Sequence, residues 1–497
     1  MKKNTNRLRI CVYNSSSNDL IFSSAANENI MSPLKKMISI YSNKPSELMS
    51  DTDYLKKSSK RDISEHFFDD IKEKAKKSFQ ASSSNFKNIL IHNETERNNS
   101  YLTQRKDLIE NDIRNKKILT IKRTTKSKEI VASLSKLTKN DIEKAWVIFY
   151  WIGHNIEYDT KSYFSGKSVS SLTMDVLRTG KSVCSGYAHL FQEFCDLIGL
   201  QCFLVSGTAK GLSFDTNKTE SNHAWNLVKI DAVSYLMDST WGAGHLRENE
   251  FIFEFNPFYF MVNPEHLIYT HFPEKSENQL LAKSRTMEKF INSVALEHFY
   301  FDYGIKNLNI TEKKLVVLDE VTLFCEDENN LVYLATVKKN GTELEGYTWI
   351  ERAKNKVKII AQFPCKGNFE LLVFAKRLDS QKTYHKLFSY DISVQRDNGS
   401  AKGFPMTYKH FEESECFLYE PKTQSLKINT KVRFDIKIKN CLEAYVIIGE
   451  KWNNMTKTSK ECHFHGDFLI DSNKVTIYGK FQEGKNNWGL VQYEVRN

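Results

Sequence analysis

The feature that most constrains the fold is an apolar stripe of helical period that starts just after Cys184 and stops at Gly199. This spacing predicts an amphipathic helix with one face in a hydrophobic core, and the glycine after it is a helix-stop signal. Cys184 therefore falls in the first turn of a core helix. The residues of the stripe recur at i, i+3, i+4, i+7, i+10 and i+11, and they are Tyr187, Leu190, Phe191, Phe194, Leu197 and Ile198.

The first-turn position changes the chemistry expected of Cys184. Unpaired N–H groups and the positive end of the helix dipole stabilise a thiolate there. The preceding loop adds two cations, Arg178 and Lys181. A lone cysteine at a helix start is more often a small buried hydrophobe. A second and a third residue are therefore needed before Cys184 is interpreted as the nucleophile of covalent acyl chemistry.

Two short β-strands are predicted downstream of this helix, at residues 224–230 and 233–237. Both are rich in apolar residues, and residues 231–232 between them fit a two-residue hairpin turn. In the simplest register, Ile230 pairs with Val233. The two strands are therefore predicted to form an antiparallel hairpin.

This hairpin brings a histidine and an aspartate together. In the predicted register His223 and Asp238 share a face as diagonal neighbours, roughly 7 Å apart at the backbone, whereas a one-residue slip would separate them. A cysteine, a histidine base and a carboxylate that orients the base form a catalytic triad. Each residue alone is more often structural. Their order, the helix start and the shared face together favour Cys184, His223 and Asp238 as catalytic residues.

Several segments resemble the transglutaminase-like superfamily and, more narrowly, its kyphoscoliosis peptidase group. The resemblance implies a papain-like α+β core with Cys184 as nucleophile, His223 as general base and Asp238 as the orienting group. The group also includes members that lost triad residues and act as cytoskeletal scaffolds. The segments that carry the resemblance are residues 184–188, 205–211, 223–226 and 238–244, with 258–265 and 269–273 resembling the part that closes the core.

Two functions stay open on the sequence alone. In the first, Cys184 attacks a carboxamide or peptide carbonyl of a protein substrate, and water or an amine resolves the thioester. In the second, the core is a catalytically silent recognition domain, and the chain is a scaffold for cytoskeletal partners. The sequence specifies neither the acyl donor nor the choice between hydrolysis and amine transfer. It contains no acidic loop clearly built for calcium, so we predict no cofactor.

An oxyanion hole requires donors aimed at the developing negative charge. The backbone N–H of Cys184 is the obvious first donor. Tyr158 and Trp151 are candidates for the second, although Trp151 lies on a predicted helix face with Trp146, where a core position is the more frequent outcome.

The basic charge is concentrated near the N-terminus. Residues 1–137 contain 27 Lys and Arg against 16 Asp and Glu, while the remaining 360 residues contain 44 against 45. The first 137 residues also lack tryptophan and glycine. Residues 1–120 are therefore predicted to be a disordered basic tail, with a transient helix near 63–79. A solvated charged surface is favoured over a binding site for acidic filaments or anionic lipid, and nucleic acid is an unlikely partner.

The remaining chain divides into a core and two β-rich modules. The catalytic core is predicted at residues 121–285, followed by β-sandwich-like modules at 286–400 and 401–497. A pattern at 356–359 recurs at 474–477, which indicates a duplication. A cluster of Cys462, His463, His465 and Asp467 resembles metal ligands, but no second ligand pair accompanies it, and a strand surface is the favoured interpretation.

The cellular location is predicted from what the sequence lacks. No apolar run reaches the roughly 18 residues of a membrane span, and the first residues lead to no signal-peptide core. Nine cysteines without a pairing pattern suit a reducing compartment. We therefore expect a cytoplasmic protein, with cytoskeletal association as a further possibility. The predicted fold class is α+β: a papain-like transglutaminase core, two β-sandwich-like modules and a disordered N-terminal tail.

Overall fold

The computed structural model describes two parts of the chain. In the first, two strands, β1 (Arg9–Asn14) and β2 (Asp19–Ser24), pair antiparallel, a hairpin that the composition did not predict. The other residues up to 102, including the helix predicted near 63–79, lie outside the described residues. The second part is residues 103–497 apart from 167–169, 213, 218–219, 232, 379–382, 398–402, 459–461 and 484–485.

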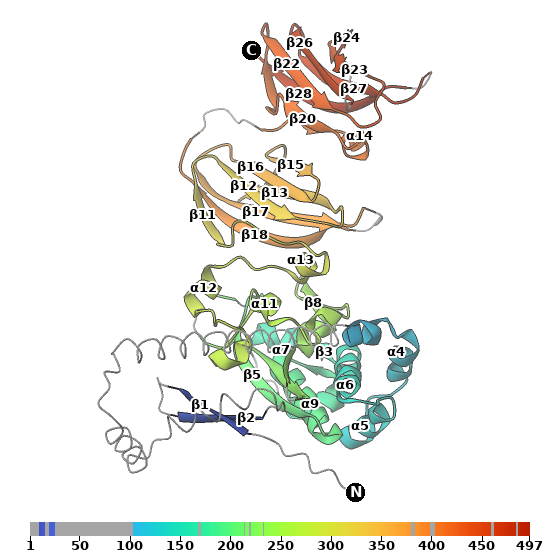
Figure 1. Cartoon of the computed structure of the whole chain (residues 1–497), viewed down its shortest axis with the longest axis vertical. Coiled ribbons are helices and arrows are strands. Elements are labelled where there is room, and N and C mark those ends of the chain that lie inside the picture. The colour runs from blue at the N-terminus through green and yellow to red at the C-terminus, as the bar shows by residue number, and fades with distance from the viewer. Residues whose placement is uncertain are drawn as a thin grey trace, which may run out of the picture. The chain divides into compact units, whose positions relative to one another are not determined.

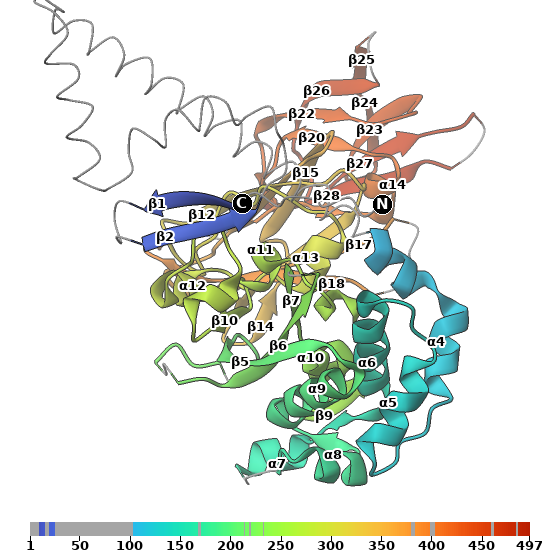
Figure 2. The same ribbon diagram turned by 60° about the horizontal axis from the view of Figure 1, so that its bottom comes forward.

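The core consists of helices packed against one antiparallel sheet (Figure 1). The strand order is β10–β5–β6–β7, so β5 and β6 are central. One helix, α9, packs on both central strands, and Figure 2 shows it beside α6 with α5 close to both. The strands are β10 (His271–Pro273), β5 (Gln201–Ala209), β6 (His223–Ile230) and β7 (Val233–Met237), and the main helices are α4 (Asp112–Leu119), α5 (Ser127–Ser135), α6 (Asp141–Asn155) and α9 (Cys184–Ile198).

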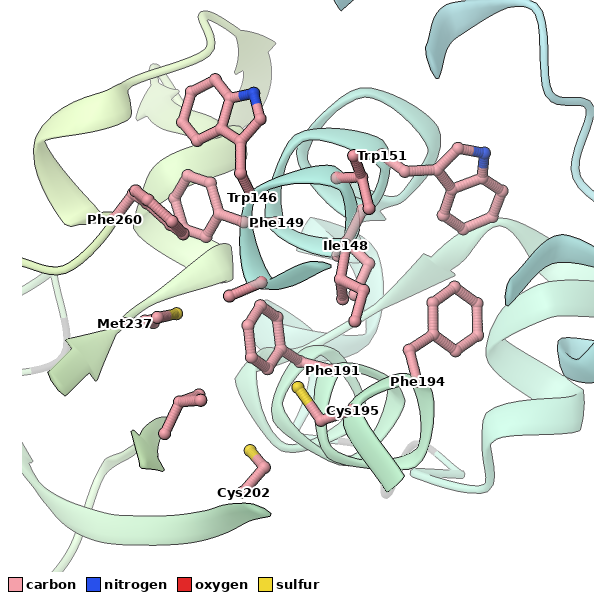
Figure 3. Close-up of a cluster of buried hydrophobic side chains, with 14 of the residues drawn as sticks. Trp146, Ile148, Phe149, Trp151, Phe191, Phe194, Cys195, Cys202, Met237 and Phe260 are labelled. Carbon is pink, nitrogen blue, oxygen red and sulfur yellow. The ribbon is translucent and has the colours of Figure 1, made fainter. Parts of the chain in front are cut away.

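Helix α9 forms where the apolar stripe predicts it. Gly199 follows its last residue with a φ of 83°, a left-handed conformation that glycine adopts without strain. Phe191 and Phe194 of α9 join Trp146 of α6 in a fully buried cluster (Figure 3). Burying one such ring stabilises the fold by roughly 1.5–3 kcal/mol. This packing fixes the position of the first turn of α9.

The folded core extends further towards the N-terminus than the sequence indicates. Residues 103–120 fall within the predicted tail, yet Leu108 and Ile118 are buried in the same hydrophobic cluster as α6. The guanidinium of Arg105 donates hydrogen bonds to the carbonyls of Pro257 and Phe260 at 2.7 and 2.8 Å. A few buried side chains pack this segment against the core, but they are too few to change its overall polar composition. Residues 103–120 therefore belong with the core rather than with a tail.

Short elements surround the site and connect the core to the next module. Three of them, α8 (Thr173–Thr179), β4 (Lys181–Ser182) and α10 (Ser239–Ala243), contact α9. The others up to residue 253 are β3 (Glu157–Tyr158), α7 (Thr160–Ser165), β8 (Gly244–Arg247) and β9 (Glu250–Phe253). Further along the chain come η2 (Pro257–Tyr259), α11 (Pro264–Leu267), η3 (Ser276–Gln279), α12 (Met287–Asn292) and α13 (His298–Asp302).

The first β-rich module is a sandwich of two sheets around its own hydrophobic cluster. One sheet has the order β11–β18–β17–β13–β14, and the other has the order β12–β16–β15. Its strands are β11 (Lys314–Val317), β12 (Glu320–Glu326), β13 (Val332–Lys339), β14 (Thr342–Leu344), β15 (Thr348–Ala353), β16 (Lys356–Gln362), β17 (Gly367–Lys376) and β18 (His385–Val394).

The second β-rich module repeats this architecture. One sheet has the order β19–β28–β27–β23–β24, with β21 also paired to β28, and the other has the order β20–β22–β26–β25. The predicted fold class, an α+β core followed by two β-sandwich-like modules, is thus confirmed. The elements are β19 (Met406–Thr407), α14 (Lys409–Glu413), β20 (Phe417–Glu420), β21 (Ser425–Lys427), β22 (Lys431–Lys437), β23 (Glu443–Ile448), β24 (Lys451–Asn454), β25 (Thr456–Thr458), β26 (His463–Leu469), β27 (Lys474–Lys480) and β28 (Trp488–Arg496).

The sequence pattern that indicated a duplication matches strands that are not equivalent. Its first copy lies in β16, the central strand of the three-stranded sheet, whereas its second copy lies in β27, between β23 and β28 of the larger sheet. By its place in the sheet, β26 is the counterpart of β16. Alternating apolar residues are common to all buried strands of a sandwich, which explains why two different strands look alike.

Candidate active site

Cys184 is the half-buried first residue of α9. Its thiol interacts with the imidazole of His223 and with the backbone N–H of Ala224. Burial alone would raise the pKa of the thiol, but the hydrogen bonds and the charge of His223 outweigh burial and hold the pKa below that of an ordinary cysteine. The environment therefore favours a thiolate.

The hairpin that carries the other two residues has the predicted register. Ile230 pairs with Val233, and the ladder continues to the pair Asn226 and Met237. Asp231 in the turn has a φ of 49°, a left-handed conformation that aspartate tolerates better than most residues. His223 and Asp238 lie just beyond the last pair, at the open end of the hairpin.

Asp238 has two separate tasks, one for each carboxylate oxygen. Oδ1 accepts hydrogen bonds from the backbone N–H groups of Thr240 and Trp241 at 2.8 and 3.1 Å and so caps α10. Oδ2 accepts a hydrogen bond from Nε2 of His223 at 2.7 Å. Burial alone would raise the pKa of the carboxyl, but His223 and a second histidine hold it far below its usual range. Asp238 is therefore an ionised acceptor.

This geometry fixes the protons of His223. An ionised carboxylate only accepts, so Nε2 of His223 carries a proton, and Nδ1 is the nitrogen left for Cys184. Burial opposes a charge on the imidazole, but Asp238 and Cys184 raise its pKa to about 10. The lowered pKa of Cys184 and the raised pKa of His223 both favour a thiolate and an imidazolium over the two neutral groups, with the Asp238 carboxylate bound to the far side of the imidazole.

The second histidine on Asp238, His271, is absent from the sequence-based site. Its Nε2 donates to the same Oδ2 at 3.0 Å, and the side chain is fully buried. It comes from the edge strand β10, where it pairs with Ala209 of β5. Segment 269–273 contributes to the family resemblance, but only a long-range strand pairing brings His271 to Asp238. No local pattern in the sequence carries that pairing.

Two asparagines near the hairpin have other roles. The side chain of Asn222 exchanges hydrogen bonds with the backbone of Ala209 at 2.7 and 3.0 Å. The amide of Asn226 donates to the carbonyl of Ala188 at 3.0 Å. These bonds fix strand β6 against β5 and α9.

Trp151 and Tyr158, the two candidates for a second oxyanion donor, differ in whether their donor group is near Cys184. Trp151 is fully buried, and its indole N–H donates to the carbonyl of Ile121 at 2.8 Å, so it does not serve the site. Tyr158 lies on β3, paired with Ser182 two residues before the nucleophile. Burial raises the pKa of Tyr158, and the nearby Cys184 raises it further. Its hydroxyl therefore stays protonated and lies close enough to sense the thiolate.

The ligand atoms of His223, Asp238 and His271 lie within 4.8 Å of one another. The two contacts to Asp238 are hydrogen bonds, and each needs a proton on the imidazole nitrogen. A metal would have to displace both protons, because metal-bound imidazole nitrogens are unprotonated.

His463, a member of the cluster near Cys462 in the second β-rich module, also contacts a carboxylate. It donates a hydrogen bond to Asp435, and its ring lies 5.1 Å from that of Tyr419.

Two models of known protein families match parts of this chain. Residues 128–241 match the model of the transglutaminase-like superfamily. The core is transglutaminase-like. Residues 287–405, which include the first β-rich module, match the KY-like, immunoglobulin-like domain. The transglutaminase-like match contains Cys184, His223 and Asp238, whereas His271 lies beyond it.

Curated relatives match across the transglutaminase-like core and beyond. Kyphoscoliosis peptidase of Mus musculus is 30% identical over 280 residues, 54% of this chain and 42% of that protein. Kyphoscoliosis peptidase of Homo sapiens is 31% identical over 270 residues, 53% and 40% of the two chains. Hillarin of Drosophila melanogaster is 23% identical over 286 residues, 51% and 35%. The predicted family resemblance is confirmed, and the chain spans about two fifths of the length of the two peptidases.

Within the described residues, every helix is too short or too polar to cross a bilayer.

Proposed function

We propose that the transglutaminase-like core performs thiol-dependent acyl chemistry on a protein substrate, with Cys184 as nucleophile, His223 as general acid and base, and Asp238 as the residue that orients His223. The observation that supports this proposal is the continuous set of contacts from the Cys184 thiol through His223 to Asp238. Such an arrangement provides a nucleophile, a proton carrier and a fixed tautomer.

In the first half of the reaction, the Cys184 thiolate attacks the carbonyl carbon of a carboxamide or peptide, and a carbon–sulfur bond forms. The oxyanion accepts hydrogen bonds from the backbone N–H of Cys184 and the hydroxyl of Tyr158. The His223 imidazolium gives its Nδ1 proton to the departing nitrogen. The carbon–nitrogen bond breaks, an amine or ammonia leaves, and a thioester remains.

In the second half, water or an amine attacks the thioester while neutral His223 accepts its proton. The carbon–sulfur bond breaks, and a carboxylic acid or a new amide leaves. The thiolate and imidazolium are restored. Throughout, Asp238 accepts a hydrogen bond from the Nε2–H group of His223 and never needs to become protonated.

The β-rich modules supply no residues to this chemistry in the proposal. Sandwich domains of this kind typically bind or space other parts, so we assign them to binding the protein substrate or a cytoskeletal partner. We assign residues 121–285, with residues 103–120 packed against them, to the catalytic unit, and residues 286–400 and 401–497 to the two modules.

Selective alkylation tests the nucleophile. Iodoacetamide at pH 6.5 should label Cys184 at least about ten times faster than any other cysteine, because an ordinary thiol with a pKa near 8.5 is almost fully protonated there. Cys365 is also half-buried and forms no disulfide. Because Lys339 Nζ lies 2.9 Å from its Sγ, it is the control for a thiol with a cation nearby but no histidine. Mass spectrometry of the labelled peptides gives each rate.

The same protein then distinguishes an enzyme from a silent scaffold. We expect incorporation of a fluorescent amine into casein, or release of peptides from it, and loss of both in Cys184→Ala but not in Cys365→Ala. A Cys184 that reacts no faster than Cys365 would contradict the proposal and support the catalytically silent scaffold.

A further inference from the structure

The inference concerns His271 and rests on the proposed function. Asp238 Oδ2 receives two imidazole N–H groups, one from His223 at 2.7 Å and one from His271 at 3.0 Å. All three side chains are buried. Because the carboxylate is fully buried, the number and strength of its hydrogen bonds decide how basic it is towards His223.

The proton positions on His271 follow from its partners. Nε2 faces an ionised carboxylate and must carry a proton. Nδ1 lies 2.9 Å from the hydroxyl of Thr270. Burial lowers the pKa of His271, and the charge on His223 lowers it further, against the opposing effect of Asp238. His271 is therefore neutral, and its unprotonated Nδ1 accepts a hydrogen bond from the Thr270 hydroxyl, whose other acceptor is the Leu267 carbonyl at 3.2 Å.

The two histidines thus share one carboxylate in opposite charge states. His223 is the charged partner because it also faces the Cys184 thiolate. His271 is the neutral partner because its other nitrogen faces only a hydroxyl. Two full positive charges on one buried carboxylate would be unfavourable. Each histidine therefore limits the charge that the other can hold.

We propose that His271 is a positioning residue that, by donating its Nε2 proton to Oδ2 of Asp238, limits how firmly the carboxylate holds the proton of His223. Catalysis needs this limit. An imidazolium that is too strongly stabilised is a poor acid, and it would be slow to protonate the departing nitrogen. Thr270 supports the arrangement because its hydroxyl fixes the tautomer of His271.

Other ionisable groups lie near this cluster. Burial raises the pKa of each tyrosine among them, so these hydroxyls stay protonated while His223 titrates. Cys184 is the remaining group, and its titration is coupled to that of His223. The groups are Cys184 and Tyr187 from α9, Tyr158 from β3 and Tyr259 from η2.

The test measures the ionisation of His223 directly, by NMR titration of full-length protein labelled with 13C in its histidines. His271→Leu removes the donor and keeps a similar volume. We expect the His223 inflection to move to higher pH by about half a unit to one unit, and the upper inflection in the pH profile of Cys184 alkylation to move with it. His271→Gln keeps an amide N–H near the position of Nε2 and should restore both inflections.

Thr270→Val provides a variant of nearly unchanged shape. Without the hydroxyl, His271 is a weaker donor, so the shift should have the same direction and a smaller size. This variant decides the matter if His271→Leu does not fold. An unchanged His223 inflection in a folded His271→Leu or in Thr270→Val would overturn the inference.

The outcome is distinguishable from failure of the proposed function. If wild-type Cys184 is not activated, the proposed function fails, whatever the variants do. If wild-type Cys184 is activated and the His271 and Thr270 variants leave both inflections in place, only the role of His271 fails. A merely structural His271 would lower the melting temperature without moving either inflection.

Discussion

The protein contains the same pair of residues, a histidine donating to an aspartate, in two very different surroundings. In the core, His223 and Asp238 have side-chain exposures of 7% and 0%. In the second β-rich module, His463 and Asp435 lie on the strands β26 and β22 with exposures of 32% and 16%. The core pair also contacts a thiol and a second histidine, whereas the module pair lies beside Tyr419.

The difference shows what turns a common polar contact into a candidate catalytic site. Because the pair is buried, the charge of Asp238 acts on His223 with little screening. The imidazolium that results lies beside a thiol at a helix start, where it stabilises the thiolate. A half-buried pair such as His463 and Asp435 has water as an alternative partner, so it contributes less to stability. A histidine paired with an aspartate is therefore not enough to indicate a catalytic site. The burial of the pair and the groups around it distinguish the candidate site from the module pair.

The largest effect is expected from Asp238→Asn. The amide would present N–H groups to both histidines, so the tautomer of His223 is lost, and acylation of Cys184 should slow by about two to four orders of magnitude. Because the same side chain caps α10 and holds two buried histidines, unfolding should also become easier by about 2–4 kcal/mol. Casein-based acyl transfer and urea unfolding measure the two effects.

Asp435→Asn is the matched control in the module. Because the His463–Asp435 pair is only half-buried, the substitution should change the free energy of unfolding by less than about 1 kcal/mol and leave acylation unchanged. Equal losses in the two variants would mean that burial does not separate the two pairs.

The second prediction concerns the thiol. In His223→Gln the partner that lowers the pKa of Cys184 is gone, and burial then raises that pKa. Alkylation by iodoacetamide at pH 7 should fall by about 10- to 100-fold. His463→Gln should leave the rate as it is. A His223→Gln variant that alkylates at the wild-type rate would show that the helix start alone activates Cys184.

These comparisons also show which parts of the molecule were predictable. Helix α9 and the hairpin of β6 and β7 are local, and an apolar period or a two-residue turn is enough to predict them. The proximity of His223 to Asp238 follows from that hairpin. His271 depends on β10 pairing with β5, two segments more than sixty residues apart, and no local period encodes such a pairing.

The structure differs from the sequence-based prediction at two other places, and in both the local sequence pattern carries too little information. The buried face at residues 103–120 consists of a few side chains in a polar segment, so composition hides it. The apparent duplication aligned β16 with β27 because alternation marks every buried strand equally, whereas the equivalent positions depend on sheet order. Sequence alone predicted the number of sandwiches correctly, but not which strands correspond.

The third prediction uses pH to isolate the core pair. Cys184 and His223 exchange a proton within the pair, so the effect of His223 is clearest in Cys184→Ala. The pKa of His223 is raised in the folded protein. Its contribution to stability is therefore fully present below its unfolded pKa near 6.5 and is lost as pH rises through the folded value.

The measurement compares Cys184→Ala with Cys184→Ala/His223→Gln by urea unfolding from pH 6 to 10. The stability advantage of the histidine should shrink by up to about 1 kcal/mol per pH unit above 6.5. For Asp238 the sign is opposite: its contribution is lost as pH falls below about 4. An advantage that stays constant from pH 6 to 10 would mean that His223 has an ordinary pKa.

The smallest expected effect comes from Lys210, a half-buried cation of the core that has no carboxylate among its described contacts. Its ammonium donates to the carbonyl and hydroxyl oxygens of Ser293 at 2.6 and 3.1 Å and lies 4.5 Å from the ring of Phe290. Burial, with Arg285 and Lys313 nearby, lowers the pKa of Lys210 to about 7. The charged form is thus unfavourable in the folded protein, the reverse of His223.

The sign of the pH dependence reverses accordingly. Between pH 7 and about 10.5 the unfolded chain keeps the Lys210 proton while the folded protein releases it, so stability should rise with pH over this range. Relative to Lys210→Met, which cannot titrate, the wild-type melting temperature should rise by a few degrees from pH 7 to 9. Differential scanning fluorimetry at matched ionic strength measures it. Parallel curves for the two proteins would show that Lys210 keeps an ordinary pKa, and that burial without a counter-ion is better tolerated here than the contrast between the two histidine pairs implies.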